Sequence, residues 1–280
     1  MSKKSGHDET SIGQRLRVEP GEKLALNDVD TRDTPLAPGG KKEGRKTLEE
    51  MHERLNELQE VLYAESERAL LVVLQALDTG GKDGTIRKVL GPLNPQGVRV
   101  TSFKPPTPDE LAHDYLWRIH NAVPSKGTIG VFNRSHYEDV LITRVHKWIP
   151  KKVTTQRFKQ INNFEKHLTE NGVTLLKFYL HISREEQRER LQKRLENPEK
   201  HWKFSSADLA ERELWDDYID AYDEVLRACT TPWAPWYVIP ADRKWYRDFA
   251  VGSILLETLE GMDLRYPPPE EGLDDIQIPD

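Results

Sequence analysis

The sequence predicts an α/β fold in which a parallel sheet is flanked by helices on both faces. Two observations support this prediction. Short apolar runs that suit buried strands alternate along the chain with segments whose apolar residues recur at helical spacing. One of these runs, LLVVLQA, changes at once into LDTGGKDGT, which is typical of a buried strand that leads through a glycine-rich turn into a helix.

The composition is that of an ordinary globular protein. Of the 280 residues, 36% are hydrophobic and 31% are charged, which excludes a fibrous chain. No apolar run is long enough to cross a bilayer, and the opening MSKKSGHDET lacks the apolar core of a secretory signal. We therefore expect a cytoplasmic protein with no membrane partner.

Charge and cysteine content narrow the class of function further. The formal net charge of −6 disfavours a general nucleic-acid binder, so no nucleic-acid partner is expected. Cys229 is the single cysteine and cannot form a disulfide within the chain, and no Cys/His cluster has zinc spacing. Because Cys229 lies late in a helical pattern, we expect a packed thiol rather than a nucleophile.

The chain divides into three parts. Residues 1–45 are polar and lack a sustained period, so we expect an extended or disordered N-terminal arm, which can still dock on the domain. Residues 46–266 show no internal repeat and no break in composition, and they are expected to form one domain. Residues 267–280 form a polar C-terminal tail.

The first helix of the domain has a start signal. Thr47 and Glu50 match a capping box, and the apolar residues that follow recur at helical spacing. These residues are Met51, Leu55, Leu58 and Leu62. The sequence therefore predicts a helix that begins near Thr47 and precedes the first strand.

Strands and helices alternate from there to the end of the domain. The patterns predict a helix over 85–90, a strand over 98–103, a helix marked by Leu111 to Ile119, a strand over 128–132, a helix over about 152–170 and a strand over 173–182. They then predict a helix capped by Ser183 and Glu186, a helix over about 207–228, a strand over 236–241 and a helix capped by Asp242 that ends near Gly261. Because ligands bind at the carboxyl ends of the strands in such sheets, residues that follow strands are the candidates for function.

The glycine-rich turn partly matches the P-loop pattern G-x-x-x-x-G-K-[ST]. Gly81 and Lys82 fit, whereas Ala76 replaces the first glycine and Asp83 stands where a hydroxyl is usual. Bare backbone N–H groups and a helix N-terminus can bind an anion there, and Lys82 adds a positive charge against phosphate oxygens. The predicted phosphate-binding residues of the turn are Gly80, Gly81, Asp83, Gly84 and Thr85.

Asp78 is unusual inside such a turn. A carboxylate repels a phosphate unless a divalent cation lies between them, so Asp78 argues for Mg²⁺ held partly by its side chain. The alternative is a plain glycine turn with a solvated lysine.

A second cluster of polar residues follows another predicted strand, in FNRSHYED. Asn133 comes directly after the apolar run and could bind a metal or a metal-bound water, and Arg134 would stabilise charge on a transferred phosphoryl group. Glu138 and Asp139 are candidates for metal contacts, although acidic residues also favour the first turn of a helix. His136 is expected to be structural, because phosphoryl transfer depends mainly on positioning and charge.

The segment SREEQRERLQKRLENPEKHWKFS is rich in basic residues. A charged helix of this kind is often only a solvated face. We favour a helical lid over about 184–206 that closes over the phosphate and excludes water. Its basic residues include Lys193, Arg194, Lys200 and Lys203.

Taken together, ALDTGGKDGT, FNRSHYEDVL, KRLENPEKHWKFS and WYVIPADRKWYR closely resemble the family-2 polyphosphate kinases, over residues 47 to 266. The resemblance implies a P-loop kinase-like fold that moves the terminal phosphoryl group of inorganic polyphosphate reversibly to a nucleoside mono- or diphosphate, with Mg²⁺ or Mn²⁺ as cofactor. Adenine nucleotides, and guanine nucleotides beside them, are the implied acceptors. A homo-oligomer, dimer or tetramer, is also implied.

The resemblance suggests roles for single residues as well. It makes Asp78 and Lys82 essential to the chemistry, Arg134 a charge stabiliser, and the basic lid residues Lys193, Arg194, Lys200 and Lys203 polyphosphate contacts. The metal ligands predicted from the residues themselves are Asp78 of the turn and Asp139 of the second cluster. Some members have Asp at the position of Asn133. With Asn there, this chain resembles the subgroup that accepts both AMP and ADP.

Two other functions remain open from the sequence. One is a conventional nucleotide kinase that uses ATP as donor with the same loop and lid. The other is a non-catalytic module that binds a polyanion such as RNA through the lid lysines, without turnover and without a need for Asp78.

Overall fold

The structure, a computed structural model, describes residues 10–272, 276 and 278–279. Its centre is one parallel sheet of five strands in the order β2-β3-β1-β4-β5. The strands are β1 (Ala69–Gln75), β2 (Val98–Ser102), β3 (Ile129–Asn133), β4 (Val173–His181) and β5 (Trp236–Pro240). The predicted α/β fold is confirmed, and each predicted strand is present within about two residues of its expected bounds.

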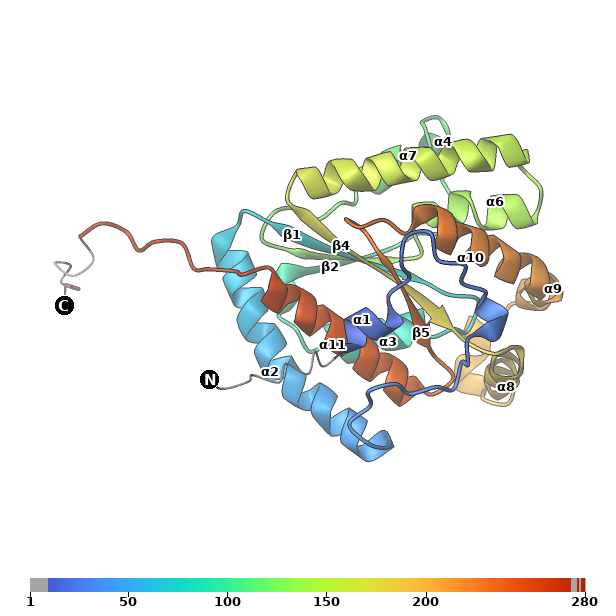
Figure 1. Ribbon diagram of the computed structural model, residues 1–280, viewed down its shortest axis with the longest axis horizontal. Coiled ribbons are helices and arrows are strands. Elements are labelled where there is room, and N and C mark those ends of the chain that lie inside the picture. Colours follow the sequence, from blue (N-terminus) through green and yellow to red (C-terminus); the bar gives the residue numbers. More distant parts are fainter. Residues whose placement is uncertain (1–9, 273–275, 277, 280) are drawn as a thin grey trace, which may run out of the picture.

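Helices cover both faces of the sheet. The helices α2 (Lys41–Glu65) and α11 (Lys244–Gly261) pack together on one face, and α7 (Lys151–Glu170) and α10 (Trp215–Cys229) lie on the other (Figure 1). The sheet is therefore buried on both sides, and this explains why every residue of β1 is apolar or fully buried.

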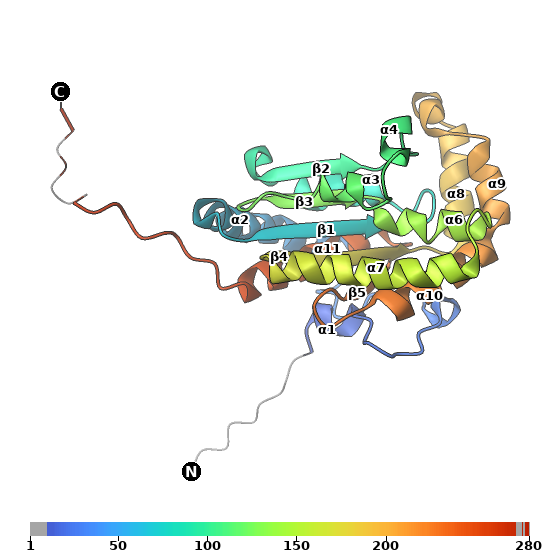
Figure 2. The same ribbon diagram turned by 90° about the horizontal axis from the view of Figure 1, so that it is seen from above.

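The shorter elements lie mainly beyond the carboxyl ends of the strands. Figure 2 shows α4, α6, α8 and α9 at that end of the sheet. The short helices are α3 (Lys82–Thr85), α4 (Pro108–Leu111), α5 (Trp117–His120), α6 (Ile142–Val145), α8 (Arg184–Leu195) and α9 (Ala207–Glu213). A π-helical turn (Ile86–Leu90) follows α3, and 3-10 turns form at Leu26–Asp28, Pro95–Gly97, His136–Asp139 and Pro198–Lys203.

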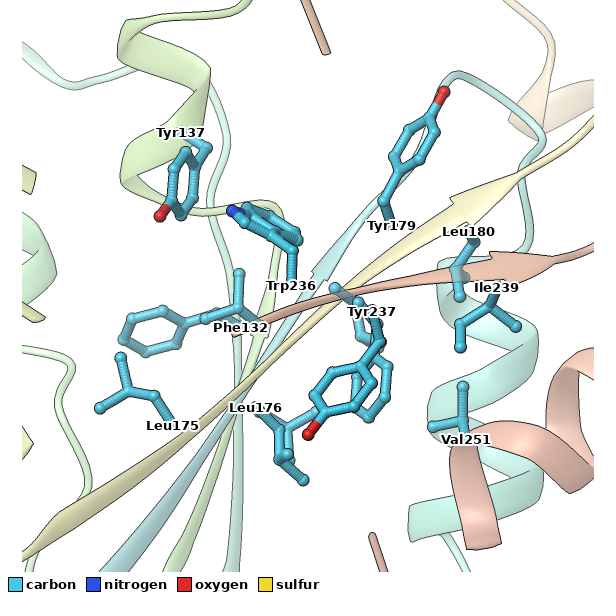
Figure 3. Packing of buried hydrophobic residues seen from close by; sticks show 14 of the residues in the cluster. Phe132, Tyr137, Leu175, Leu176, Tyr179, Leu180, Trp236, Tyr237, Ile239 and Val251 are labelled. Atoms are coloured by element: carbon cyan, nitrogen blue, oxygen red, sulfur yellow. The ribbon is translucent and has the colours of Figure 1, made fainter. Parts of the chain in front are cut away.

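The core lies between the sheet and α11 on one side and α7 and α10 on the other. In Figure 3 the rings of Tyr137 and Trp236 lie next to each other, and their centroids are 4.7 Å apart in an edge-to-face arrangement. Phe132, Leu176 and Ile239 bring β3, β4 and β5 into the same cluster. Within the described ranges, no helix is both long and apolar enough to cross a bilayer.

A buried polar cluster connects the sheet to α7. The Nζ of Lys177 lies 2.6 Å from the Glu165 carboxylate, which also accepts a bond of 2.7 Å from the Tyr137 hydroxyl and contacts His136 at 3.2 Å. All four side chains are fully buried. His136 is structural, as expected, and Cys229 is buried, which raises the pKa of its thiol.

The N-terminal boundary of α2 differs from the prediction. The helix begins at Lys41, six residues before Thr47, because Glu43 accepts a bond of 3.1 Å from the Gly40 N–H. Thr47 lies inside the helix, where its hydroxyl donates to the Glu43 carbonyl at 3.0 Å. The capping-box pattern at Thr47 and Glu50 is therefore coincidental.

The described part of the arm packs against the edge of the sheet. It contains a short helix, α1 (Ile12–Leu16), and then runs antiparallel to β5, where the Val18 N–H donates to the Trp236 carbonyl at 2.8 Å. Leu26 is fully buried. The arm thus covers an otherwise open strand edge.

Three further expectations are wrong in detail. The single helix expected over 111–119 is two short helices, α4 and α5, and the helix expected over 207–228 breaks at Leu214 into α9 and α10. Asp242 does not cap α11, whose N-cap is Arg243. Its carboxylate instead accepts bonds of 2.8 Å from the Ser183 N–H and from the Thr31 hydroxyl.

Candidate active site

The glycine-rich turn connects β1 to α3 at the carboxyl edge of the sheet. Gly81 is the N-cap of α3 and has a φ of +109°, a left-handed conformation that favours glycine. A Cβ at Gly80 would lie 2.5 Å from the Cβ of Ala76. Both positions therefore require glycine, and the backbone is left bare for close approach of an anion.

Lys82 lies among the charged groups of the turn. Its Nζ donates to the Ala76 carbonyl at 2.8 Å. The pKa of Lys82 is lowered to about 8, mainly because the side chain is buried and also because Arg134 is nearby, while Asp78 and Glu138 act in the opposite direction. The structure thus brings together residues that the sequence placed in two separate motifs.

Arg134 bridges the two motifs directly. Its Nη2 lies 3.1 Å from Oδ1 of Asp78, and its Nη1 lies 3.9 Å from Oε2 of Glu138. Arg134 has a φ of +62°, which for a residue with a side chain costs on the order of 1–3 kcal/mol. Such strain occurs mainly at functional sites, where the surrounding structure holds it in place.

Glu138 is held by a side chain that the sequence analysis missed. Gln75, the last residue of β1, is fully buried. With its amide turned to satisfy both groups, its nitrogen donates to Oε1 of Glu138 at 3.0 Å and its oxygen accepts from Ser135. In the sequence, a polar residue at the end of an otherwise apolar strand is the feature that indicates such a role for Gln75.

Asp83 connects the turn to the other two motifs. Its Oδ1 accepts a bond of 2.8 Å from the Asn133 amide, and its Oδ2 lies 3.7 Å from the Nζ of Lys203. Asn133 therefore contacts a carboxylate of the turn, which an aspartate at that position would repel.

Asp139 contacts Arg157 of α7. Its Oδ1 is 3.5 Å from Nη1 of Arg157, and burial raises the pKa of Asp139 to about 6 although Arg157 opposes this shift. Across the described ranges, no three His, Cys, Asp or Glu side chains come close enough to form a metal cage by themselves. A pair of carboxylates can hold Mg²⁺ together with substrate phosphates and water, so Asp78 and Asp139 as joint metal ligands stay a prediction.

The predicted lid residues lie at the same edge, on and beyond α8 (Figure 2). Lys203 contacts the turn through Asp83. Lys193 pairs with Glu189 at 3.0 Å, Arg194 lies 3.5 Å from Asp208, and Lys200 is exposed. The basic residues therefore share one region, with three of them facing solvent or neighbouring lid residues.

A buried arginine lies behind the turn. Arg247 of α11 is 3% exposed and pairs with Asp248 at 2.6 Å. A Cβ at Gly81 would lie only 1.8 Å from its Nη1, so the guanidinium packs directly on the glycine backbone. The sequence pattern gave no indication of this contact.

Two cavities meet at the site. The smaller, of about 200 Å³, is bordered by the turn, α8 and α10, and its lining includes Asp78, Gln187, Tyr218 and Tyr222. The larger, of about 690 Å³, lies between the β2–β3 connection and α7. Arg134 and Glu138 line both cavities, whereas Asp139 lines the larger one alone.

The larger cavity has the character of a site for an organic anion. Its lining combines the rings of Phe103, Tyr115 and Trp148 with the guanidinium groups of Arg118 and Arg157. The Arg157 guanidinium lies 4.6 Å from the centroid of the Tyr115 ring. The sequence analysis gave none of these five residues a role. Phe103 ends a predicted strand, Tyr115, Arg118 and Arg157 fall within predicted helices, and Trp148 falls within no predicted element.

Comparison with known proteins gives a consistent result. The family model described as Polyphosphate kinase 2 (PPK2) matches residues 39–267. An AMP/ADP-polyphosphate phosphotransferase of Meiothermus ruber is 52% identical over 265 residues, which is 95% of this chain and 99% of that protein. An ADP-polyphosphate phosphotransferase of Rhodopseudomonas palustris is 44% identical, over 91% of this chain and 92% of its own.

The fold is also similar to that of a solved structure. The crystal structure of Polyphosphate Kinase 2 from Arthrobacter aurescens TC1 superimposes with a TM-score of 0.92 at 46% sequence identity. The match covers 95% of this chain and 94% of that chain.

Proposed function

The chain belongs to the polyphosphate kinase 2 family, and on that premise we propose that it transfers the terminal phosphoryl group of inorganic polyphosphate to AMP and ADP. The observation that carries this proposal is the position of Arg134, which borders both cavities and pairs with Asp78 of the turn. Arg134, Glu138 and Ile142 line both cavities, and of these three Arg134 is the one with a positive charge for a phosphoryl group. The names of the two relatives support the same reaction.

The donor chain is assigned to the turn and the lid. Glycine-exposed amides and Lys82 bind the terminal phosphoryl group, and the basic end of the lid binds the phosphates that follow. Lys203 already reaches the turn through Asp83, so a bound polyphosphate would compete with that carboxylate for the lysine.

The acceptor nucleotide is assigned to the larger cavity. Its aromatic rings suit a purine, and Arg118 and Arg157 suit the charge of its phosphates. With the base in this cavity, the acceptor phosphate points toward Arg134 and the donor. Adenine nucleotides are the proposed acceptors, with guanine nucleotides beside them.

The reaction requires positioning more than acid–base chemistry. The phosphate of AMP or ADP is already ionised at neutral pH, so it needs no general base. Lys82 and Arg134 neutralise the charge that spreads over the transferred group in the transition state. Because one phosphoanhydride bond forms as another breaks when ADP is the acceptor, we propose that the transfer is reversible.

A magnesium ion suits the carboxylates that the site offers. Mg²⁺ is usually bound by one or two carboxylates together with substrate phosphates and water, so a three-carboxylate cage is not needed. Asp78 and Glu138 flank Arg134 at the smaller cavity, and we propose these two as its protein contacts. When bound, Mg²⁺, or Mn²⁺ in its place, neutralises phosphate charge and orients the donor.

One assay tests the proposal. The protein is incubated with long-chain polyphosphate and Mg²⁺, AMP and ADP are supplied separately, and the nucleotides formed are identified. Formation of ADP from AMP and of ATP from ADP is expected. Phosphorylation of AMP that requires ATP and ignores polyphosphate would favour the conventional kinase, and binding without turnover would favour the polyanion-binding module.

Assembly and location are further parts of the proposal. The edge strand β2 leaves Val100 46% exposed, and an open edge of this kind can pair with a second copy of the chain. We propose a cytoplasmic homo-oligomer, dimer or tetramer. Light scattering coupled to size-exclusion chromatography tests its size, and a monomer would contradict it.

A further inference from the structure

One buried arginine attaches the middle of α8 to the glycine-rich turn. Arg190 is 7% exposed, and its guanidinium bonds to five oxygens from three parts of the chain. They are the carbonyls of Thr79 (2.9 Å), Gly80 (3.2 Å), Ala241 (2.7 Å) and Asp242 (3.2 Å) and the carboxylate of Glu186 (2.7 Å). Arg190 therefore connects the turn, the end of β5 and the lid helix.

A neighbour on the same helix continues this pattern. The Nε2 of Gln187, one turn before Arg190 on α8, donates to the Asp78 carbonyl at 3.1 Å. Together the two side chains hold the carbonyls of three successive peptide units of the turn, those of Asp78, Thr79 and Gly80.

Fixing these carbonyls also fixes the N–H groups opposite to them. In a planar trans peptide the N–H points away from the C=O, so each held carbonyl orients the N–H of the next residue. The Gly80 N–H donates to the Leu77 carbonyl at 2.9 Å. The N–H groups of Thr79 and Gly81 have no acceptor among the residues that the structure describes, and so they remain available to an anion.

The turn needs such support at Thr79. This residue has a φ of +63°, which is strained for a β-branched side chain. A strained conformation persists only where surrounding contacts hold it, and the bond from Arg190 to the Thr79 carbonyl is one of these contacts.

We propose that Arg190 is a positioning residue for phosphoryl transfer, which orients the N–H groups of the turn toward the phosphoryl group and anchors the lid helix to the turn. This inference rests on the proposed function. Lys193 and Arg194 follow within about one further turn of the same helix, so the anchor at Arg190 also sets the place from which the basic end of the lid extends. Glu186 and the four carbonyls use the whole planar fork of the arginine, which a lysine cannot reproduce.

The test compares Arg190→Lys with Arg188→Lys, an exposed arginine on the same helix. Arg190→Lys keeps the charge and loses the fork, and it should lower kcat/KM for polyphosphate by about 100-fold, because a misplaced binding group costs about that much. The larger share should fall on kcat, since the N–H contacts strengthen as charge develops. Arg188→Lys should stay within about twofold of the wild type in both parameters.

Two additional measurements separate positioning from loss of fold. Thermal unfolding confirms that each variant is folded at the assay temperature, and added guanidinium should restore turnover to Arg190→Ala where ammonium does not. Should Arg190→Lys not fold, Gln187→Met removes a single bond to the turn and should lower kcat roughly tenfold. A folded Arg190→Lys or Gln187→Met with wild-type kcat would overturn the proposal.

A binding experiment keeps this test distinct from that of the function. Calorimetry with inorganic triphosphate measures the anion site without any turnover. Arg190→Lys should bind triphosphate roughly fivefold more weakly than wild type. If the wild type fails to use polyphosphate, the proposed function fails. The positioning role is then judged on triphosphate affinity alone, and unchanged affinity would overturn it.

Discussion

At the residue scale, Lys82 is expected to set the alkaline limit of activity. Burial lowers its pKa from 10.5 to about 8. A neutral amine cannot neutralise a phosphate oxygen, and kcat/KM reports the ionisations of the free enzyme, so kcat/KM should fall about tenfold per pH unit above about pH 8. A pH profile with polyphosphate and ADP checks this. Lys82→Ala should be inactive at every pH, and a flat profile up to about pH 9.5 would contradict the role of Lys82.

The same ionisation affects stability with the opposite sign. Between about pH 8 and 10.5 the unfolded chain keeps a proton on Lys82 that the folded protein has lost. The contribution of Lys82 to the free energy of unfolding therefore rises with pH in this window. Below about pH 8 the cost of burying the charge is present in full. In denaturant unfolding, Lys82→Met lacks this cost, so its advantage over the wild type should shrink as the pH rises.

Asn133 provides a second test at this scale. Asn133→Asp would replace the 2.8 Å bond to Asp83 by a like-charge contact, which should destabilise the metal-free protein by about 1 kcal/mol. A divalent cation would offset that repulsion, so added Mg²⁺ should recover the lost stability. Thermal unfolding with Mg²⁺ and with chelator measures the effect. Asn133→Ala is the matched control, since it loses the bond without gaining a charge and should not respond to Mg²⁺.

The sequence identified the residues of the two motifs, but it did not identify the side chains that hold them in place. The glycine turn, Lys82 and Arg134 are visible because their chemistry depends on local sequence. Gln75 and Arg247 act through contacts with residues far along the chain, and no local pattern indicates such contacts.

At the scale of the elements, strands were more predictable than helix ends. A strand that is buried on both faces must be apolar throughout, so its residues mark it clearly. Helix starts depend on single capping contacts, and several residues can supply one. The contact that begins α2 comes from Gly40 and Glu43, whereas Thr47 and Glu50 were expected to supply it. The break between α9 and α10 at Leu214 leaves the helical pattern of the sequence almost unchanged.

Asp242 was expected to cap α11, and its actual contacts are important for a different helix, α8. Its carboxylate accepts bonds from Ser183, the N-cap of α8, and from Thr31 of the arm. Asp242→Ala should therefore lower the free energy of unfolding by about 2–3 kcal/mol, since it leaves three partly buried donor groups without an acceptor. Denaturant unfolding measures the loss. Thr31→Val removes only the bond to the arm and should cost less than half as much; equal losses in the two variants would contradict a role for Asp242 at the lid helix.

At the scale of the whole molecule, the site exists because the strands are parallel. The motifs after β1 and β3 are about fifty residues apart in the sequence, yet both strands end at one edge of the sheet. Neither the strand order nor the larger cavity follows from periodicity, because both depend on pairings between distant segments. The resemblance to a known family supplied the function where the local patterns left three alternatives open.

The charge distribution of the molecule leads to a last prediction. The chain carries a net charge of −6 and should repel a polyanion as a whole, so binding must depend on the basic residues gathered at the lid and the turn. Binding of a dense polyanion releases counterions, so the KM for long-chain polyphosphate should rise steeply with salt, as a straight line in logarithmic coordinates. Lys200 is exposed at the lid, and Lys200→Ala should reduce that slope by about 1 and leave kcat nearly unchanged. Lys126→Ala, at an exposed lysine on the loop before β3, is the control and should leave the slope unaltered. If both variants keep the wild-type slope, Lys200 does not contact the polyphosphate chain, and the donor path must be sought away from this part of the lid.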